Sequence, residues 1–444
     1  MRRLTRREWL GILTFVALAI AFGAVVMFRS AFLHKRYTDL AVFLRAAWAV
    51  SHGLDLYAIT DDKGLFYHYP PLLAILLIPL ADPPGSARVL FALKAGLWYF
   101  LSLAVLLAAV HGLASALERT SPVLTNLDGS DRRRWWWTLR LAPLLACLPH
   151  LGHSLGLGQV NVLWLALLCG MSASLLRGRS WNAGFFLAGA ICLKVVPAFL
   201  VLYPLWRRDA RCLAGCVLGL FVGLVAIPIL ALGPQRAWDS GDQWVEVLLK
   251  PAFGLGGDQA RQKDLLDITA THNQGLLALF HNTLHLTDDP RPPQAASATR
   301  LASMAVGGLL TLMTLLAAGW RRTDSPLAPV LLLGALILNM LLLSPAGHAH
   351  YIVLIIPLMM GILVTLWQRA GEPYWNGRLS LLFLVNLLTS GIPLIVCWNV
   401  LYDVGVPIQG AMVYWVAGNV LLWKMTHGRR ITSATHSDLG RAAA

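Results

Sequence analysis

Charge is scarce in this 444-residue chain. Only 13% of its residues are charged and 57% are hydrophobic, which gives a mean hydropathy of +0.63. A soluble protein carries roughly a quarter charged residues. The hydrophobic residues also fall in repeated runs of about 20, the length that a helix needs to cross a membrane. The composition therefore excludes a soluble globular protein and predicts an all-α polytopic membrane protein.

Carboxylates within the apolar runs and cysteines in a metal-binding or disulfide pattern are also missing. The apolar runs contain no mid-run carboxylate, whereas a proton- or sodium-coupled transporter normally carries one at membrane depth. The six cysteines lie in or beside apolar runs without Cys-x-x-Cys spacing, so we expect packing residues rather than disulfides or a metal site. The sequence has no Gly-rich phosphate loop, so it predicts no nucleotide site and no cofactor.

The net charge of +14 could suggest a nucleic-acid partner, but its distribution argues against one. Most of the Lys and Arg residues lie in short segments that we assign to the cytoplasm, and the acids lean to the outside. This is the bias of an integral membrane protein. We predict a multi-pass protein of the bacterial inner membrane with both termini in the cytoplasm. The run 9–28 has no small-residue cleavage site after it, so it reads as an uncleaved first span.

The remaining apolar runs predict the order of the membrane segments. One run, 182–206, has basic residues at both ends, so it either crosses once or turns back at Lys194 as two half-helices. The turn-back keeps 132–134 and Arg177 in the cytoplasm, and we prefer it for that reason. It gives about 12 membrane segments. Besides 9–28 and the two half-helices, these are 89–116, 139–152, 159–176, 212–232, 298–320, 326–343, 351–368, 379–398 and 408–423.

This topology leaves two long external loops, 30–88 and 233–296. Loops of that length are usually functional or disordered. Within the first loop we expect a helix over 39–52 and a juxtamembrane helix over 69–81, a run too short to span. The predicted organisation is a membrane module at 1–232 that includes loop 30–88, the second loop at 233–296, and C-terminal spans at 297–444.

Polar residues gather at the predicted external boundary of the membrane, where a lipid-borne substrate can present its headgroup. Lys194 lies at membrane depth, where an ionisable residue is costly and usually functional. The others that we take as site candidates are Asp39, Tyr69, Gln159, Asn161, Asn273, Gln274, His348 and His350.

Four of these residues also have a purely structural explanation. Asp39 opens the expected helix 39–52 and could be its N-cap. Lys194 could extend its ammonium to the membrane interface as readily as bind an anion. His348 and His350 are a weak metal signal, and hydrogen bonding or core packing explains them as well.

Short stretches spread in order over residues 38–351 resemble glycosyltransferase family 87, the polyprenyl-phosphate-mannose-dependent α-mannosyltransferases of the GT-C superfamily. Each stretch alone is short, and the ordered set carries the resemblance. The stretches are 38–40, 51–57, 69–74, 158–161, 193–197, 273–275 and 344–351.

The resemblance implies a GT-C helical bundle whose active site lies on the extracytoplasmic side. It maps the catalytic carboxylate to Asp39. It maps the late histidine motif to 344–351, where this chain has Gly-His-Ala-His-Tyr in place of a family Ser-Trp-Ser-His-His pattern, and we assign the histidine role to His350. The implied donor is a sugar, mannose, β-linked to a polyprenyl phosphate, and the implied acceptor is a lipid or glycan. No metal or general acid is required by such a reaction.

The chemistry implied by the resemblance suits these residues. A sugar hydroxyl is too weak an acid to ionise alone, so a base must take its proton in the transition state, and Asp39 is the candidate. The leaving phosphate gains charge and needs cationic or hydrogen-bonding groups, for which Lys194 and His350 are the candidates. The alternatives are a lipid or polysaccharide transporter or flippase, a membrane scaffold, and a GT-C transferase of another sugar.

Overall fold

The computed structural model describes residues 5–33, 38–127, 129–252, 267–320, 325–371, 377–396 and 399–441. Over these residues the chain is helical, and its only β-pairing is two isolated bridges. Seven helices are long and apolar enough to cross a membrane, and four shorter apolar helices lie among them. The expected all-α polytopic fold is confirmed, but the expected count of twelve membrane segments is not.

The missing segment is 139–152. It is divided between α6 (Gly129–Ala146) and α7 (Leu148–Leu157), which are broken apart at Cys147. Three arginines near the start of α6, together with Arg140, keep its hydropathy low, and Pro143 removes a helical hydrogen bond in its last turn. Neither helix is therefore long and apolar enough to cross alone.

The long helices follow the apolar runs closely, because each run is bounded by charged or turn-forming residues that end it. They are α1 with its π-helical turn (Arg6–Phe28, Arg29–Leu33), α4 (Arg88–Thr120), α11 continued by η4 and α12 (Ala210–Phe221, Val222–Ala226, Ile227–Leu232), α17 (Ser297–Ala318), η6 continued by α19 (Ala349–Ile355, Ile356–Ala370), α20 (Gly377–Val396) and α22 (Val406–Arg441).

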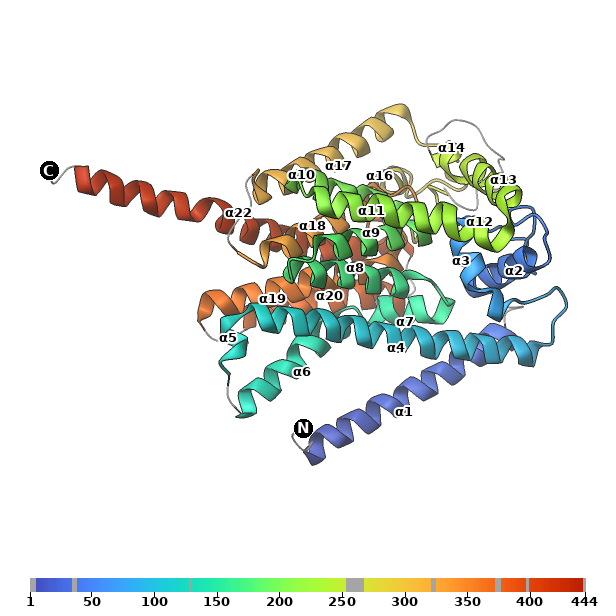
Figure 1. Ribbon diagram of the computed structural model, residues 1–444, viewed down its shortest axis with the longest axis horizontal. Helices are drawn as coiled ribbons and strands as arrows, with labels where there is room; N and C mark the ends of the chain where they lie inside the picture. Colours follow the sequence, from blue (N-terminus) through green and yellow to red (C-terminus); the bar gives the residue numbers. More distant parts are fainter. Residues whose placement is uncertain are drawn as a thin grey trace.

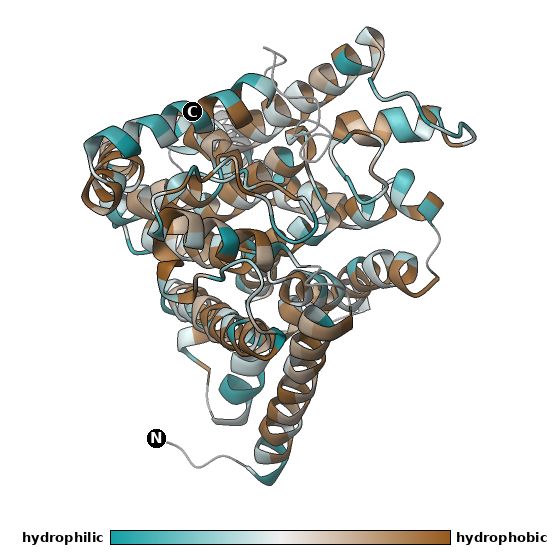
Figure 2. Cartoon of the chain, turned by 90° about the vertical axis from the view of Figure 1, so that its right-hand side faces the viewer, coloured by the Kyte–Doolittle hydropathy of each residue, from teal (hydrophilic) through white to brown (hydrophobic). Residues whose placement is uncertain are grey.

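The core of the bundle is built from helices that are apolar on every side. They are α8 (Asn161–Leu176), α18 (Ala328–Leu343) and α19. In the span Ala349–Ala370, 94% of the most apolar 18-residue stretch is buried inside the protein. The corresponding share for the span that contains α1 is 11%. An all-round apolar helix needs either protein or lipid around it, so α1 is left as a lipid-facing helix. In Figure 2 this helix is hydrophobic along nearly its whole length.

The run 182–206 turns back at Lys194, as the charge pattern predicted. It forms α9 (Ser180–Leu193), the 3₁₀ helix η3 (Val196–Val201) and α10 (Leu202–Arg207). Lys194 ends α9 in an extended conformation, with φ −159° and ψ 127°. The Ser180 hydroxyl donates to Asp209 Oδ2 at 2.7 Å, so the two ends of the hairpin lie together. Lys194 is therefore at the tip of a helical hairpin.

Two glycines fix this hairpin against α11. A β-carbon at Gly184 of α9 would fall on the backbone of α11, and one at Gly215 of α11 would fall on the backbone of α9. The two helices therefore pack in backbone contact, as small residues allow in membrane proteins.

The first predicted loop forms a compact layer at one end of the bundle (Figure 1). It contains α2 (Asp39–Ser51), as expected for 39–52, while the run 69–81 forms α3 (Pro71–Leu76) and the 3₁₀ helix η2 (Ile78–Leu80). Two ion pairs tie the layer together: Arg45 with Asp62 at 2.7 Å, and Lys94 with Asp82 at 2.9 Å.

The second predicted loop, 233–296, is described except for residues 253–266. It begins with α13 (Pro234–Trp244), η5 (Val245–Leu249) and α14 (Lys250–Ala252), and it ends with α16 (Leu276–Leu284). Figure 1 shows α13 at the same end of the molecule as α2 and α3. The opposite end carries α5 (Pro122–Thr125) and the C-terminus. The two predicted external loops thus share one end of the bundle.

The sidedness of these ends is a prediction that cysteine labelling checks. In a variant without native cysteines, Ala58→Cys should react with an impermeant thiol reagent added outside intact cells, and Gly178→Cys should react only after permeabilisation. Both residues are exposed, so reagent access does not limit either one. Labelling of Gly178→Cys from outside would overturn the assigned orientation.

Candidate active site

Asp39 is the first residue of α2, but it does not cap the helix. Thr38 is the N-cap, and its hydroxyl oxygen accepts a 3.4 Å hydrogen bond from the Ala41 amide. Oδ2 of Asp39 instead accepts a hydrogen bond from the Gln159 side-chain amide. The capping explanation of Asp39 is therefore wrong, and its carboxylate is directed at another part of the chain.

The surroundings of Asp39 raise its pKa to about 6. Burial is the main cause, because it disfavours the charged form. The ammonium of Lys194 acts in the opposite direction and lowers this pKa, while the carboxylate of Asp61 raises it. The carboxyl group thus titrates close to neutral pH, where a general base is most effective.

Gly158 places Gln159 beside Asp39. It ends α7 with φ +67°, a left-handed conformation that strains any residue with a β-carbon. A β-carbon there would also come within 2.7 Å of the Leu40 side chain on α2. The Trp98 indole fixes the turn by donating to the Gly158 carbonyl at 2.9 Å. The sequence motif 158–161 is therefore a tight turn packed against the start of α2.

Lys194 lies among aromatic side chains at the tip of the hairpin. Its ammonium donates to the Tyr351 hydroxyl and lies 3.5 Å from the Tyr69 hydroxyl. It also lies 4.2 Å from the ring centre of Tyr351 and 5.7 Å from that of Trp164, within cation–π range. It forms no ion pair with any described residue. By contrast, Lys94 is already paired with Asp82, so of these two lysines Lys194 is the one with a charge available to a ligand.

Four histidines come together beside this lysine. His350 is buried at 5% exposure, and its Nε2 has no hydrogen-bond partner within the described chain. Its ring stacks on His348 at 5.4 Å between centroids and meets His153 edge-on at 5.2 Å. His153 in turn lies 6.4 Å from His272, which is exposed. The four histidines thus extend from His272 at the surface to the buried ring of His350, whose Nε2 has no hydrogen-bond partner within the described chain.

Asn273 and Gln274 act within the protein rather than toward a cavity. The Asn273 side-chain oxygen accepts from the amides of Gly275 and Gly347, each at 3.1 Å, and its amide group donates to the Pro345 carbonyl at 2.8 Å. Gln274 donates to the Tyr402 carbonyl at 3.0 Å. The Asn273 contacts tie this part of the second loop to the segment 344–350, so Asn273 holds the backbone that carries His348 and His350. The Gln274 side chain instead anchors the loop to α21 (Asn399–Asp403).

Asn161 is also internal. It begins α8, is fully buried, and donates to the Ser154 hydroxyl at 3.4 Å, while Ser154 donates to the His350 carbonyl at 3.3 Å. Asn161 therefore supports the backbone of His350 through Ser154. Four of the residues expected to bind substrate lie close together: Tyr69, Lys194, His348 and His350. Asp39 lies near enough to interact electrostatically with Lys194 and Tyr69.

Tyr351, Trp164, His153 and His272 were not selected from the sequence. Tyr351 ends the motif 344–351, which was a usable signal. Trp164 resembles any interface tryptophan in the sequence, and only the fold brings its ring to Lys194. His153 and His272 lie 119 positions apart in the chain, so their proximity requires the tertiary structure.

Comparison with known proteins decides the family. The sequence profile of Glycosyltransferase family 87 matches residues 67–345, more than half of the chain. The protein belongs to glycosyltransferase family 87. The expected family and the expected enzyme class, a membrane glycosyltransferase, are thereby confirmed. The matched region of this family 87 protein contains Tyr69, Gln159 and Lys194, whereas Asp39 and His350 lie outside it.

Curated relatives of this family 87 protein extend the similarity over nearly the whole chain. The polyprenol-phosphate-mannose-dependent alpha-(1-2)-phosphatidylinositol mannoside mannosyltransferase of Mycobacterium tuberculosis is 27% identical over 451 residues, covering 97% of this chain and 95% of the relative. The pentamannoside mannosyltransferase of Mycolicibacterium smegmatis is 28% identical over 338 residues, covering 74% and 69%. Among solved structures, ArnT from Cupriavidus metallidurans bound to undecaprenyl phosphate has 16% identity and a TM-score of 0.37, covering 97% of this chain and 80% of that one.

The hydrogen bond from Gln159 to Asp39 gives a prediction about pH dependence. A hydrogen bond to the charged form of a carboxyl group lowers its pKa. Gln159→Met removes the donor at similar length, so the Asp39 pKa should rise and the acidic limb of the kcat/KM profile should move to higher pH. Thr38→Ala, which removes only the helix cap, is the control and should leave the limb in place. An unshifted limb in Gln159→Met would show that Gln159 is merely a packing residue.

Proposed function

We propose that this protein transfers mannose from a polyprenyl-phosphate-mannose donor to a lipid or glycan acceptor, with inversion at the anomeric carbon. The observation that carries the proposal is the juxtaposition of a carboxylate with a raised pKa, Asp39, and a lysine without an ion pair to the described chain, Lys194. The names of the mycobacterial relatives, which are polyprenol-phosphate-mannose-dependent mannosyltransferases, supply the donor.

Asp39 is the proposed general base. As the acceptor oxygen bonds to C1 of the sugar, its proton passes to the Asp39 carboxylate, and the C1–O bond to phosphate breaks on the opposite face. One displacement of this kind converts a β-linked donor into an α-linked product. With a pKa of about 6 the carboxylate is mostly ionised at neutral pH and is a stronger base than an ordinary aspartate.

Lys194 and His350 are the proposed partners of the leaving polyprenyl phosphate. The phosphate oxygen gains negative charge as the C1–O bond breaks, so groups that interact more strongly with it at that moment lower the barrier. The Lys194 ammonium supplies the charge, held by Tyr69 and Tyr351. The unused Nε2 of His350 supplies a further hydrogen-bonding group in its neutral, N–H-bearing tautomer.

The active site is proposed to face the extracytoplasmic side. The support is the positive-inside bias, which assigns the connection around Arg177 to the cytoplasm, and the position of both long loops at the other end of the bundle. Since the donor's lipid chain stays in the membrane, a site at the interface receives its headgroup directly.

The proposed function is tested with purified protein, polyprenyl-phosphate-mannose carrying labelled mannose, and a panel of lipid and glycan acceptors. The expected result is transfer of label to an acceptor in α-linkage, read by nuclear magnetic resonance, with release of polyprenyl phosphate. Transfer from the corresponding glucose lipid but not the mannose lipid would make it a transferase of another sugar. Movement of a lipid across proteoliposomes without sugar transfer would favour the transporter alternative instead.

The pKa of Asp39 predicts how the rate falls in acid. The active form of a general base is the deprotonated one, so activity is full above the pKa and is lost as the pH drops through it. We expect kcat/KM to fall about tenfold per pH unit below about pH 6. The rate profile of the purified enzyme checks this, with protein folding followed in parallel at each pH. A profile that stays flat down to pH 4.5 would exclude Asp39 as the base.

A further inference from the structure

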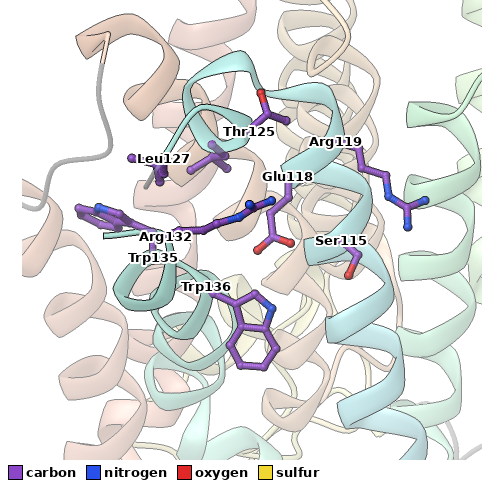
Figure 3. Close-up of a pocket in the computed structure, with 9 residues that line it drawn as sticks. Ser115, Glu118, Arg119, Thr125, Leu127, Arg132, Trp135 and Trp136 are labelled. Atoms are coloured by element: carbon purple, nitrogen blue, oxygen red, sulfur yellow. The ribbon is translucent and has the colours of Figure 1, made fainter. Parts of the chain in front are cut away.

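A polar cavity lies at the opposite end of the bundle from the candidate active site. It has a volume of about 310 Å³ and is formed by the end of α4, by α5 and by the first turns of α6 (Figure 3). Its lining combines charged, hydroxyl and indole side chains. They belong to Ser115, Glu118, Arg119, Leu124, Thr125, Leu127, Arg132, Trp135 and Trp136.

The cavity carries a surplus of positive charge. Its one carboxylate, Glu118, is neutralised by Arg140, which donates to both of its oxygens at 2.6 and 3.1 Å and is itself only 5% exposed. Arg132 extends across the cavity in Figure 3 and forms no ion pair with the described part of the chain. Arg119 also belongs to the lining, but in the same view its side chain lies on the far side of α4 and points away from Glu118 and Arg132. Because Arg140 neutralises Glu118, the cavity has a net positive charge.

An apolar groove adjoins this cavity along α6, and Trp135 lines both. The groove has a volume of about 350 Å³ and is lined by Arg134, Trp135, Trp137, Thr138, Leu141, Ala142 and Leu145. Its polar end is Arg134, whose guanidinium lies 5.7 Å from the Trp135 ring. At its other end Leu141 and Leu145 are 40% and 55% exposed. The groove therefore runs from a basic end at Arg134 to an apolar end at Leu145, 11 positions further along the helix and about 16 Å away.

We propose that the cavity and the groove together bind one anionic phospholipid. The phosphate of the headgroup lies in the cavity against Arg132, and an acyl chain passes Arg134 and lies along Leu141 and Leu145. A free phosphate would use only the basic cavity, whereas a lipid uses both, and the shared wall at Trp135 joins them. Anionic lipids are enriched in the cytoplasmic leaflet, and basic pockets between helices on that side are the sites that hold them. The assigned orientation puts this end of the bundle there.

Native mass spectrometry of the full chain tests the proposal. The purified protein is mixed with equal amounts of phosphatidylglycerol, phosphatidylethanolamine and phosphatidylcholine of matched acyl chains. We expect one phosphatidylglycerol to be retained with a preference of about tenfold or more, since charge-assisted contacts are involved. Arg132→Gln/Arg134→Gln should bring the preference close to one.

The matched control is Arg177→Gln/Arg179→Gln. These two arginines are exposed, lie in the connection between α8 and α9 on the same predicted side, and line neither hollow. The control removes the same charge and should keep the preference. An equal loss in both double variants would overturn the proposal in favour of unspecific attraction, and retention of phosphatidylethanolamine instead would overturn the anionic assignment.

A second measurement separates the lipid from free phosphate. Ala142→Trp fills the apolar groove, so it should weaken phosphatidylglycerol retention about tenfold or more without changing sugar transfer. Inorganic phosphate at millimolar concentration should displace little lipid from the unaltered protein. Full displacement by phosphate, together with unchanged retention in Ala142→Trp, would show that the cavity binds a free anion and that the groove is unused.

Discussion

Replacing Asp39 by asparagine is expected to reduce sugar transfer by about 10²–10⁴-fold, the usual contribution of a general base. The substitution keeps the shape of the side chain and an oxygen that can accept the hydrogen bond from Gln159, but it removes the ability to take a proton. The variant should therefore remain folded and still bind donor lipid. Steady-state transfer by the purified variant, together with donor binding measured separately, checks both parts of the expectation.

Two controls accompany Asp39→Asn. Thr38→Ala removes the true cap of α2 and should cost about 1 kcal/mol of stability while leaving the rate unchanged. Asp55→Asn alters a carboxylate of the same loop that accepts hydrogen bonds from the amides of Tyr57 and Ala58, at 2.9 and 3.2 Å. It should likewise transfer sugar normally. Near-normal transfer by Asp39→Asn would remove this residue from the mechanism.

Lys194→Ala is expected to weaken use of the donor by about 10- to 100-fold. A hydrogen bond to a charged group contributes roughly 1.5–3 kcal/mol, and each 1.4 kcal/mol corresponds to about a factor of ten. Because phosphate charge develops in the transition state, much of the loss should appear in kcat rather than only in KM. Rate measurements over a range of donor concentrations separate the two.

Lys94→Ala is the contrasting lysine variant. Lys94 is paired with Asp82 and donates to the Ala81 carbonyl at 2.6 Å, so its loss should lower the melting temperature and leave the kinetics of the folded fraction intact. Lys194→Arg keeps the charge and should retain more activity than Lys194→Ala. If Lys194→Ala lowers only the melting temperature, the lysine is structural.

The membrane segments could be predicted from the sequence because long apolar runs leave few structural choices. The charge pattern also predicted the reversal at Lys194, since a single crossing would have exported two arginine clusters. The broken helix pair α6 and α7 was missed because the run 139–152 is otherwise apolar and resembles a span, although Arg140 and Pro143 lie within it. The run 69–81 was expected to be one helix, but α3 ends at Leu76 and a separate 3₁₀ turn, Ile78–Leu80, follows it with Pro79 as its second residue.

The site could be predicted only in part. Lys194 was selected because an ionisable residue at membrane depth is rare and conspicuous, and Asp39 because the family resemblance maps the catalytic carboxylate to it. The sequence did not distinguish side chains that face a ligand from side chains that hold the backbone in place. Asn273 looked like a ligand-binding amide, yet its polar groups serve three backbone partners. The true cap of α2 was missed because Thr38 and Asp39 are both good capping residues.

The backbone contact between α9 and α11 has a consequence for inherited variation in this protein. Gly184 lies ten residues before Lys194 on one rigid helix, about 15 Å away. Any larger side chain at Gly184 or Gly215 must separate the two helices, and the lysine at the end of α9 would move with them. Even conservative substitutions at these positions, such as glycine to alanine, should therefore reduce turnover as substitutions in the active site do. A map of damaging variants would then include small residues along the contact between α9 and α11, about 15 Å from Lys194.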